Sequence, residues 1–384
     1  MKQPPFSLGI EEEYLIVDSK SRELVSDLPA ELLTECEALS GGQQVKPEFL
    51  RSQVEIGTRV CATVAEARES LSVLRRSVID AAAAHGLAPL AVSTHPFANW
   101  HRQEHTARER YDVLSEEMQA AARRMVICGM HVHIGIDDDE LRVDLMRQFS
   151  YFLPHLLALS CSSPFWEGED TGLRSYRLTV FDALPRTGIP ERFAGYAEYR
   201  RHVDMLIRAG VIEDATKIWW DVRPSDRYPT LETRVMDVCT RLEDALCIAA
   251  VIVSILRMLW RLRLRNQSWR SYAPMLIAEN RWRAMRYGTD EGLIDLGTGE
   301  IVPFRILMEQ LIDMTLEDAR ALDCEREVRH VLTIAERGSS AHEQLRTYAA
   351  AIDAGASPQA AMRDVVDRLI EVTGYGVGHE SHTA

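Results

Sequence analysis

The sequence predicts an α+β fold, with a sheet-forming part over about residues 1–240 and a helical part over about 241–374. Four strand-like segments alternate apolar and polar residues, so each has one apolar face that helices can cover. From residue 241 onward the pattern is almost entirely helical. A chain of 384 residues can bury a large core without disulfides or structural metals. We expect one catalytic domain over 1–374 and a mobile tail over 375–384.

Local signals place the elements of the first 162 residues. Thr63 and Glu66 form a capping-box pattern that begins a helix, and Gly86 ends that helix after His85. The other elements are expected in this order: strands over 6–18 and 53–58, a short strand over 88–93, a helix over 104–124, a strand over 126–136 and a helix over 137–162.

The next segment, 165–190, is rich in glycine and proline and is expected to be a long loop, which in compact domains is often functional. A helix should follow over 191–209 and a strand over 219–237, interrupted by Pro224 and Pro229. Ser357 and Pro358 begin the last helix, and Gly374 ends it.

Composition excludes several classes of partner. The net charge of −14 argues against a nucleic-acid binder, which should carry a basic domain. The N-terminus has no apolar signal core, and the longest apolar run, 245–256, is too short to span a bilayer, so no membrane contact is expected. The seven cysteines form no CxxC pair, which favours the reducing cytoplasm over a disulfide framework.

The polar faces of the four strand segments carry the chemistry. Residues two apart in a strand point to the same face, so Glu12 falls on the apolar face of its strand, away from its two neighbours. The polar faces carry Glu11 and Glu13 in 8–17, Gln53 and Glu55 in 51–57, His131 and His133 in 130–136, and Glu232 and Arg234 in 231–235.

Four acids would thus gather near two histidines and an arginine. For any one strand, a solvated face is the simpler interpretation, because acids and histidines are mostly exposed. Crowded carboxylates repel one another unless a cation neutralises them. All four strands show the same pattern of one apolar and one polar face, which favours a shared site over four separate solvated faces. Oxygen-rich ligands suit Mg²⁺ or Mn²⁺, and a histidine favours Mn²⁺ slightly. We therefore expect a metal-binding sheet face.

Nucleotide phosphates, if they bind, must be held by metals and arginines. The sequence has no P-loop, no dinucleotide-binding glycine motif and no GxSxG nucleophile elbow. The planar guanidinium matches phosphate oxygens, and the candidates are Arg174, Arg177, Arg186, Arg223 and Arg234. Arg234 is the strongest, since strand alternation puts it beside Glu232. A surface role is the alternative for the other four.

Five segments, in order, carry a family resemblance: FSLGIEEEYLIVD, QVEIGT, CGMHVHIGI, LPRTGIP and IWWDVRPSDRYPTLETRVMD. They resemble the YbdK-type carboxylate–amine ligases, also called glutamate–cysteine ligase type 2. The resemblance implies a glutamine-synthetase-like antiparallel sheet whose funnel-shaped face binds ATP and Mg²⁺ ions. It also implies that Glu11, Glu13, Glu55, Glu232 and His131 are metal ligands and that Arg234 contacts phosphate. Whether His133 is a ligand stays open.

The same resemblance implies ATP-driven joining of a carboxylate to an amine, with glutamate and cysteine as the usual pair. The carboxylate would attack the γ-phosphate to give an acyl phosphate, which the amine then displaces. Such chemistry asks the protein mainly for positioning and charge neutralisation, and we name Glu55 and Arg234 as catalytic. The partners are small-molecule substrates, and the choice between monomer and homodimer stays open.

Two alternatives remain. A metal-dependent hydrolase of the HxH type would need further histidines at later strand ends, whereas His155, His202 and His330 fall in helical segments. ATP dependence separates the two classes. The second alternative is a non-catalytic relative that only binds a nucleotide or metabolite.

Overall fold

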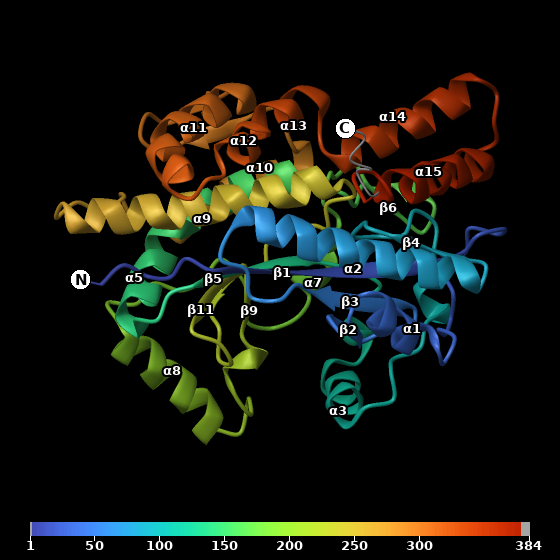
Figure 1. Ribbon diagram of the computed structural model, residues 1–384, viewed down its shortest axis with the longest axis horizontal. Coiled ribbons are helices and arrows are strands. Elements are labelled where there is room, and N and C mark those ends of the chain that lie inside the picture. The colour runs from blue at the N-terminus through green and yellow to red at the C-terminus, as the bar shows by residue number, and fades with distance from the viewer. Residues whose placement is uncertain (1, 378–384) are drawn as a thin grey trace.

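An antiparallel sheet lies at the centre of the computed structural model, which describes residues 2–377 (Figure 1). Within these residues seven strands take part, in the order β10–β11–β5–β1–β3–β2, with β4 pairing with the second half of β1. The strands are β1 (Leu8–Asp18), β2 (Gln44–Pro47), β3 (Gln53–Gly57), β4 (Leu87–Leu90), β5 (Met130–Gly135), β10 (Val222–Pro224) and β11 (Thr230–Thr233). The predicted α+β class and antiparallel sheet are confirmed.

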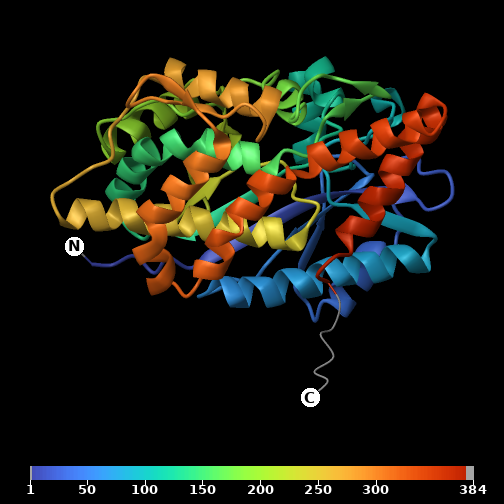
Figure 2. The same ribbon diagram turned by 90° about the horizontal axis from the view of Figure 1, so that it is seen from above.

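Two long helices, α2 (Val64–Ala84) and α9 (Leu242–Leu264), cover one face of this sheet (Figures 1 and 2). Thr63 caps α2 as predicted, because its Oγ1 accepts the Glu66 amide at 3.1 Å. The Glu66 carboxylate accepts the amide of Ala62 at 2.9 Å, one residue before the cap, so the contact to Thr63 itself that completes a capping box is not made. The apolar side chains of β1, such as Ile10 and Ile16, are fully buried under the helices. The opposite face of the sheet is left for the polar residues.

A buried ion pair joins β1 to the helical layer. Glu12 and Arg75 of α2 form two hydrogen bonds, of 2.6 and 2.9 Å, and both side chains are 0% exposed. The Tyr14 hydroxyl donates to the same carboxylate, and burial with the Glu12 charge raises the pKa of Tyr14 well above its usual value. Arg75 also donates to the carbonyls of Cys239 and Thr240, just before α9. One guanidinium therefore links three segments distant in sequence.

Several elements differ from the expected ones. The helix expected over 104–124 is interrupted at Gln119, whose φ is +47°, and that over 137–162 is divided near Pro154. The expected long loop over 165–190 contains a short helix and short strands, two of which pair with each other and one with a later strand. These elements are α3 (Glu109–Met118), α4 (Ala120–Arg123), α5 (Asp139–Phe149), α6 (Leu153–Ser160), β6 (Phe165–Trp166), β7 (Glu169–Asp170), α7 (Arg177–Phe181), β8 (Thr187–Gly188), α8 (Tyr196–Arg208) and β9 (Trp219–Trp220).

Three elements were not expected at all, namely α1 (Leu32–Leu39), β2 and a hairpin of β12 (Leu293–Asp295) and β13 (Glu300–Val302). Each is short and lacks a strong alternating or helical pattern. Apart from this hairpin, the C-terminal half is helical as predicted. Its helices after α9 are α10 (Pro274–Tyr287), α11 (Phe304–Ala321), α12 (Glu325–Arg329), α13 (Val331–Arg337), α14 (Ser340–Asp353) and α15 (Pro358–Thr373).

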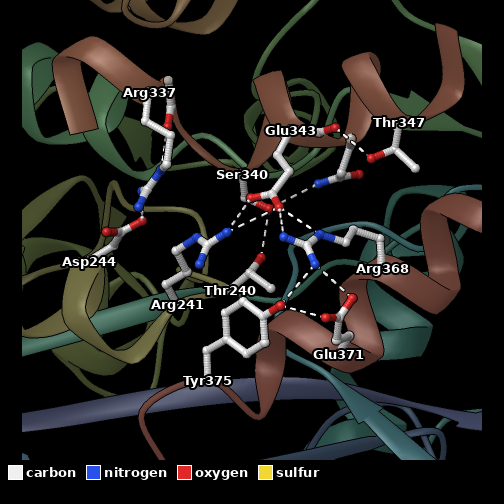
Figure 3. A network of polar contacts seen from close by, with 12 residues as sticks. Thr240, Arg241, Asp244, Arg337, Ser340, Glu343, Thr347, Arg368, Glu371 and Tyr375 are labelled. Carbon is white, nitrogen blue, oxygen red and sulfur yellow. Dashed lines mark hydrogen bonds and ion pairs between the residues drawn. The ribbon is translucent and has the colours of Figure 1, made fainter. Parts of the chain in front are cut away.

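Ion pairs hold α14 and α15 against the start of α9 (Figure 3). The Glu343 carboxylate accepts from Arg241 at 2.9 Å and from Arg368 at 2.7 Å, while Asp244 of α9 pairs with Arg337. Mobility of the tail over 375–384 stays a prediction, although the first residues of this segment contact the rest of the protein. Arg76 donates to the Val377 carbonyl at 3.0 Å, and Val377 is buried. Residues 378–384 lie outside the described part of the chain.

The central helix α9 is long and apolar enough, by length and composition, to cross a bilayer. The apolar run 245–256 within this helix is, taken alone, too short to span a bilayer. Moreover, 83% of the most apolar 18-residue window of α9 is buried inside the protein. We assign it as the core helix that backs the sheet.

Glu12→Gln should weaken folding strongly, because it leaves the Arg75 guanidinium buried without a counter-charge. We expect a loss of about 3–5 kcal/mol in the free energy of unfolding, measured by urea denaturation. Glu23→Gln is the matched control, since Glu23 is exposed, and it should change stability by less than about 0.5 kcal/mol. Equal midpoints for the two variants would contradict the role given to the pair.

Candidate active site

The polar face of the sheet forms the floor of a cavity of about 550 Å³. Eight of the ten predicted site residues line it, and Arg174 and Arg186 do not. The eight are Glu11, Glu13, Glu55, His131, Arg177, Arg223, Glu232 and Arg234.

Strand register explains why these residues meet. Glu13 of β1 lies opposite Glu55 of β3, and Glu11 lies opposite His131 of β5. On the other side of β5, His133 lies opposite Glu232 of β11. Directly opposed side chains in an antiparallel pair lie within contact distance. The floor is therefore an acidic patch with two imidazoles at its centre.

Glu11 is held by the two histidines. Its Oε2 lies 3.4 Å from His131 Nδ1 and 3.6 Å from His133 Nε2. Burial would raise the pKa of Glu11, but these contacts outweigh it and bring the pKa well below the usual range. Burial and the nearby Arg234 lower the pKa of His131 to about 4, whereas the Glu11 and Glu232 charges overcome burial and raise the pKa of His133.

Glu232 is held between two arginines. Arg223 contacts its carboxylate at 2.9 and 3.2 Å, and Arg234 pairs with the same group from two residues away. Although burial acts in the opposite direction, the two guanidinium charges bring the pKa of Glu232 well below its usual value. Arg223 directs its remaining nitrogen to the carbonyls of Thr216 and Ile218. Arg223 thus supports the floor and has few donors left for a ligand.

Three further acids are crowded together without such partners. Burial raises the pKa of Glu13 to about 7, against the opposing charge of Arg177. Burial and the Glu13 charge raise the pKa of Glu48 to about 7, while burial with Glu48 and Glu11 raises that of Glu55 to about 8. The nearest cation to Glu55 is Lys46, whose Nζ lies 3.9 Å away. This part of the floor has little positive charge to compensate its carboxylates.

The donor set suits a hard divalent cation, although its members do not converge on one point. In residues 2–377, no group of three or more His, Cys, Asp or Glu side chains is arranged to hold an ion by itself. Mg²⁺ commonly uses only one or two carboxylates together with water and substrate phosphates, so it needs no closed cage. His133 Nε2 is buried without a hydrogen-bond partner on the same floor. The residues therefore fit cations that arrive with a phosphate ligand.

Gly129, just before β5, allows Arg177 to approach the floor. A Cβ at this position would lie 2.5 Å from Arg177 Nη2 and 3.2 Å from His131 Nε2. Its amide also donates to Glu13 at 2.6 Å. A side chain at this position of the CGMHVH segment would displace the Arg177 guanidinium from beside Glu13.

Asp237 positions the segment that carries Arg177. Its buried carboxylate accepts from the Ser162 amide at 2.8 Å and from the hydroxyls of Ser163 and Ser175 at 2.7 and 2.9 Å. Ser163 Oγ in turn accepts the Arg177 amide at 3.0 Å. The 165–190 region is therefore anchored where it meets the cavity.

Arg186 lies behind the cavity wall and not on its surface. Its Nε donates to the Lys217 carbonyl at 2.9 Å, and its guanidinium lies 5.3 Å from the centre of the Trp219 ring. The position predicted for it at the phosphate site is therefore corrected.

Sequence reasoning missed Glu48, Lys46 and Lys217, which line the cavity. Register could have indicated Lys46 and Glu48, since Lys46 lies opposite Glu55 and Glu48 follows two residues later. This required knowing that β2 exists. Nothing in the local sequence marks Lys217.

The histidines that a hydrolase would need do not reach this cavity. His155 is in the core, with its ring 5.4 Å from Tyr151 and 6.0 Å from Phe152. His330 pairs with Asp244 at 2.8 Å, and His202 contacts the Glu198 carbonyl within α8. None of the three lines the cavity.

Known proteins are similar to this chain over nearly its whole length. The family described as "Glutamate-cysteine ligase family 2(GCS2)" matches residues 7–371. Proteins named "Putative glutamate--cysteine ligase 2" are similar to almost the whole chain. That of Rhodospirillum rubrum is 57% identical over 384 residues, covering 99% of each chain. That of Ruegeria pomeroyi is 56% identical, covering 96% of this chain and 95% of that one.

Two solved structures share the fold. A glutamate–cysteine ligase of Francisella tularensis, in complex with AMP, has a TM-score of 0.67 at 14% identity and covers 99% of this chain and 91% of that one. A bifunctional glutathione synthetase of Pasteurella multocida has a TM-score of 0.66 at 16% identity, covering 96% of this chain and 52% of that one. At such identities the likeness concerns the fold.

His155→Phe tests the assignment of His155 to the core. Burial lowers its pKa to about 4, against a smaller opposing effect of Asp295, so protons bind the unfolded chain more tightly. Stability from neutral His155 is present above pH 6.5 and is lost as the pH falls towards 4, by up to about 3 kcal/mol. Urea denaturation at pH 7 and pH 4 should show a smaller acid loss in the variant than in the wild type. Identical acid losses would contradict the assignment.

Proposed function

The chain belongs to glutamate–cysteine ligase family 2, and from this premise we propose that it joins the carboxylate of one small molecule to the amine of another with ATP. The acidic floor with its flanking arginines is the observation that carries the proposal. A triphosphate brings negative charge that needs cations, and the floor offers carboxylates that need them too. Glutamate and cysteine are the first pair to test, since the relatives carry those names.

In the proposed reaction a carboxylate oxygen attacks the γ-phosphorus and ADP leaves, giving an acyl phosphate. The amine nitrogen then attacks the acyl carbon, phosphate leaves, and the nitrogen loses a proton. We propose Glu11, Glu13, Glu55, Glu232 and His131 as ligands of divalent cations, which when bound would neutralise the phosphate oxygens. Arg234 and Arg177 would orient the phosphates through the donors that face the cavity.

The chain's own residues prepare this site. Arg223 holds Glu232 in place, and Gly129 admits Arg177 beside Glu13. Because both partners in the chemistry are substrates, no protein nucleophile is needed. We propose that residues 1–374 act as one catalytic unit, since the helical half covers the back of the sheet whose front carries the site. Seven buried free cysteines favour a reducing cytoplasm for it.

ADP release tests the proposal. The purified protein should release ADP with Mg²⁺ or Mn²⁺ only when both an acid and an amine are present, and EDTA should stop the release. Glutamate with cysteine is compared with aspartate, and cysteine with alanine and 2-aminobutyrate. Hydrolysis of a substrate without ATP would favour a metal-dependent hydrolase. Nucleotide binding without ADP release in any pairing would favour a non-catalytic relative.

Glu55→Gln should abolish ATP turnover while the fold is kept. The change preserves the shape of the side chain but leaves a neutral amide, which cannot lose a proton and take up charge when a cation binds. Glu300→Gln is the control, because Glu300 is exposed on the distant hairpin. Turnover is measured by ADP release and folding by circular dichroism. Full activity of the Glu55 variant at ordinary Mg²⁺ would remove this residue from the mechanism.

Arg234→Lys should lower turnover by two decades or more, equivalent to about 3 kcal/mol of transition-state stabilisation. A lysine keeps the charge but cannot reproduce the planar fork that pairs with both Glu232 and a phosphate. Single-turnover ADP formation measures the effect without product release. A lysine variant within about threefold of the wild type would assign Arg234 a structural role.

A further inference from the structure

Lys217 is a buried cation on the cavity wall that the proposed phosphate chemistry does not use. The residue is 7% exposed and lines the same cavity as the acidic floor. Its ammonium has one acidic partner, Glu213 Oε2 at 3.5 Å, and the Glu213 side chain is 61% exposed. A buried charge costs free energy unless it is well paired, and a single long contact to a solvated acid pairs it weakly.

The backbone around Lys217 is held unusually firmly. Arg223 donates to the carbonyl before it, at Thr216, and to the one after it, at Ile218. Arg186 donates to the carbonyl of Lys217 itself. Two arginines thus hold the carbonyls of three consecutive residues. Through Arg186, the LPRTGIP segment helps to position the backbone that carries the Lys217 ammonium.

The other cations of the cavity are engaged, solvated or already assigned to phosphate. Arg177 and Arg234 are proposed above to orient the phosphates, and the Nε of each is buried without a hydrogen-bond partner. Arg223 is occupied by Glu232 and by two backbone carbonyls. Arg108, Arg227 and Lys46 are exposed. Among the cavity-lining lysines and arginines that the structure describes and that the phosphate chemistry does not use, Lys217 alone combines burial with a single weak acidic partner.

We propose that Lys217 binds a second carboxylate of the acid substrate, the one that is not activated, and so selects dicarboxylic acids. The inference rests on the proposed ligase function, because it needs one carboxylate at the floor and another at the wall. An incoming carboxylate would pair directly with the ammonium in a desolvated site, where such contacts are strong. Phosphate is the other anion that could use the same donor, and the experiment separates the two.

The test compares glutamate with 4-aminobutyrate, which lacks only the α-carboxylate. Wild-type protein should prefer glutamate by at least about tenfold in kcat/KM, as expected for a charged hydrogen bond. Lys217→Met should reduce this preference to within about threefold by raising the KM for glutamate, with the KM for ATP changed less than twofold. Lys217→Arg should retain most of the preference. Lys20→Met, at an exposed lysine, is the matched control and should behave as wild type.

Two results would overturn the inference: an unchanged preference in Lys217→Met, or a raised KM for ATP with glutamate unaffected, which would assign the ammonium to phosphate. A binding experiment distinguishes failure of the Lys217 inference from failure of the proposed ligase function. If the wild type releases no ADP with any acid, calorimetric titration with glutarate still tests Lys217. Wild-type protein should bind glutarate at least about tenfold more tightly than Lys217→Met. Equal affinities, or no binding to the wild type, would overturn the inference.

Discussion

The buried ion pair between Glu12 and Arg75 determines which side chains of β1 point into the cavity. Three consecutive glutamates occupy this strand, and alternation sends the middle one to the helices and the outer two to the floor. A slip of one residue would exchange these faces, burying Glu11 and Glu13 without partners. Because Arg75 also holds the carbonyls before α9, the same pair docks the helical half on the sheet. The active face and the core are thus specified together.

The floor divides into two electrostatic regions. On the side of β11, Glu232 is compensated by two arginines and Glu11 by two histidines. On the side of β3, Glu13, Glu48 and Glu55 have little compensation, and burial raises the pKa of each. This imbalance suits a ligand that brings its own cations. In the proposed reaction, this local charge lets a chain of net charge −14 bind an anionic nucleotide.

Support for this floor comes from residues that never touch it. Asp237 accepts hydrogen bonds from one backbone amide and two serine hydroxyls near the start of α7. Asp221 and Asp182 each contact Arg281 of α10 at 2.7 Å. Paired networks of this kind, buried at Asp221 and Asp237, make a site rigid. The helical half therefore contributes by packing behind the catalytic segments, while the sheet half supplies the side chains that face the cavity.

The sequence by itself determined the faces of the strands, because a period of two is a local property of the extended chain. Alternation alone assigns Glu11, Glu13, Glu55, His131, Glu232 and Arg234 to polar faces, and the burial of Glu12 follows from the same pattern. Only the tertiary structure decided what depends on register and on distant loops. Lys46 and Glu48 reach the cavity because β2, which is too short to show an alternating pattern, pairs with β3. The places of Arg186, Arg223 and Lys217 are set by hydrogen bonds from the two arginines to backbone carbonyls at residues 216–218. Such contacts leave no periodic signal, since a backbone carbonyl is present at every residue and only the folded chain selects which arginine it meets.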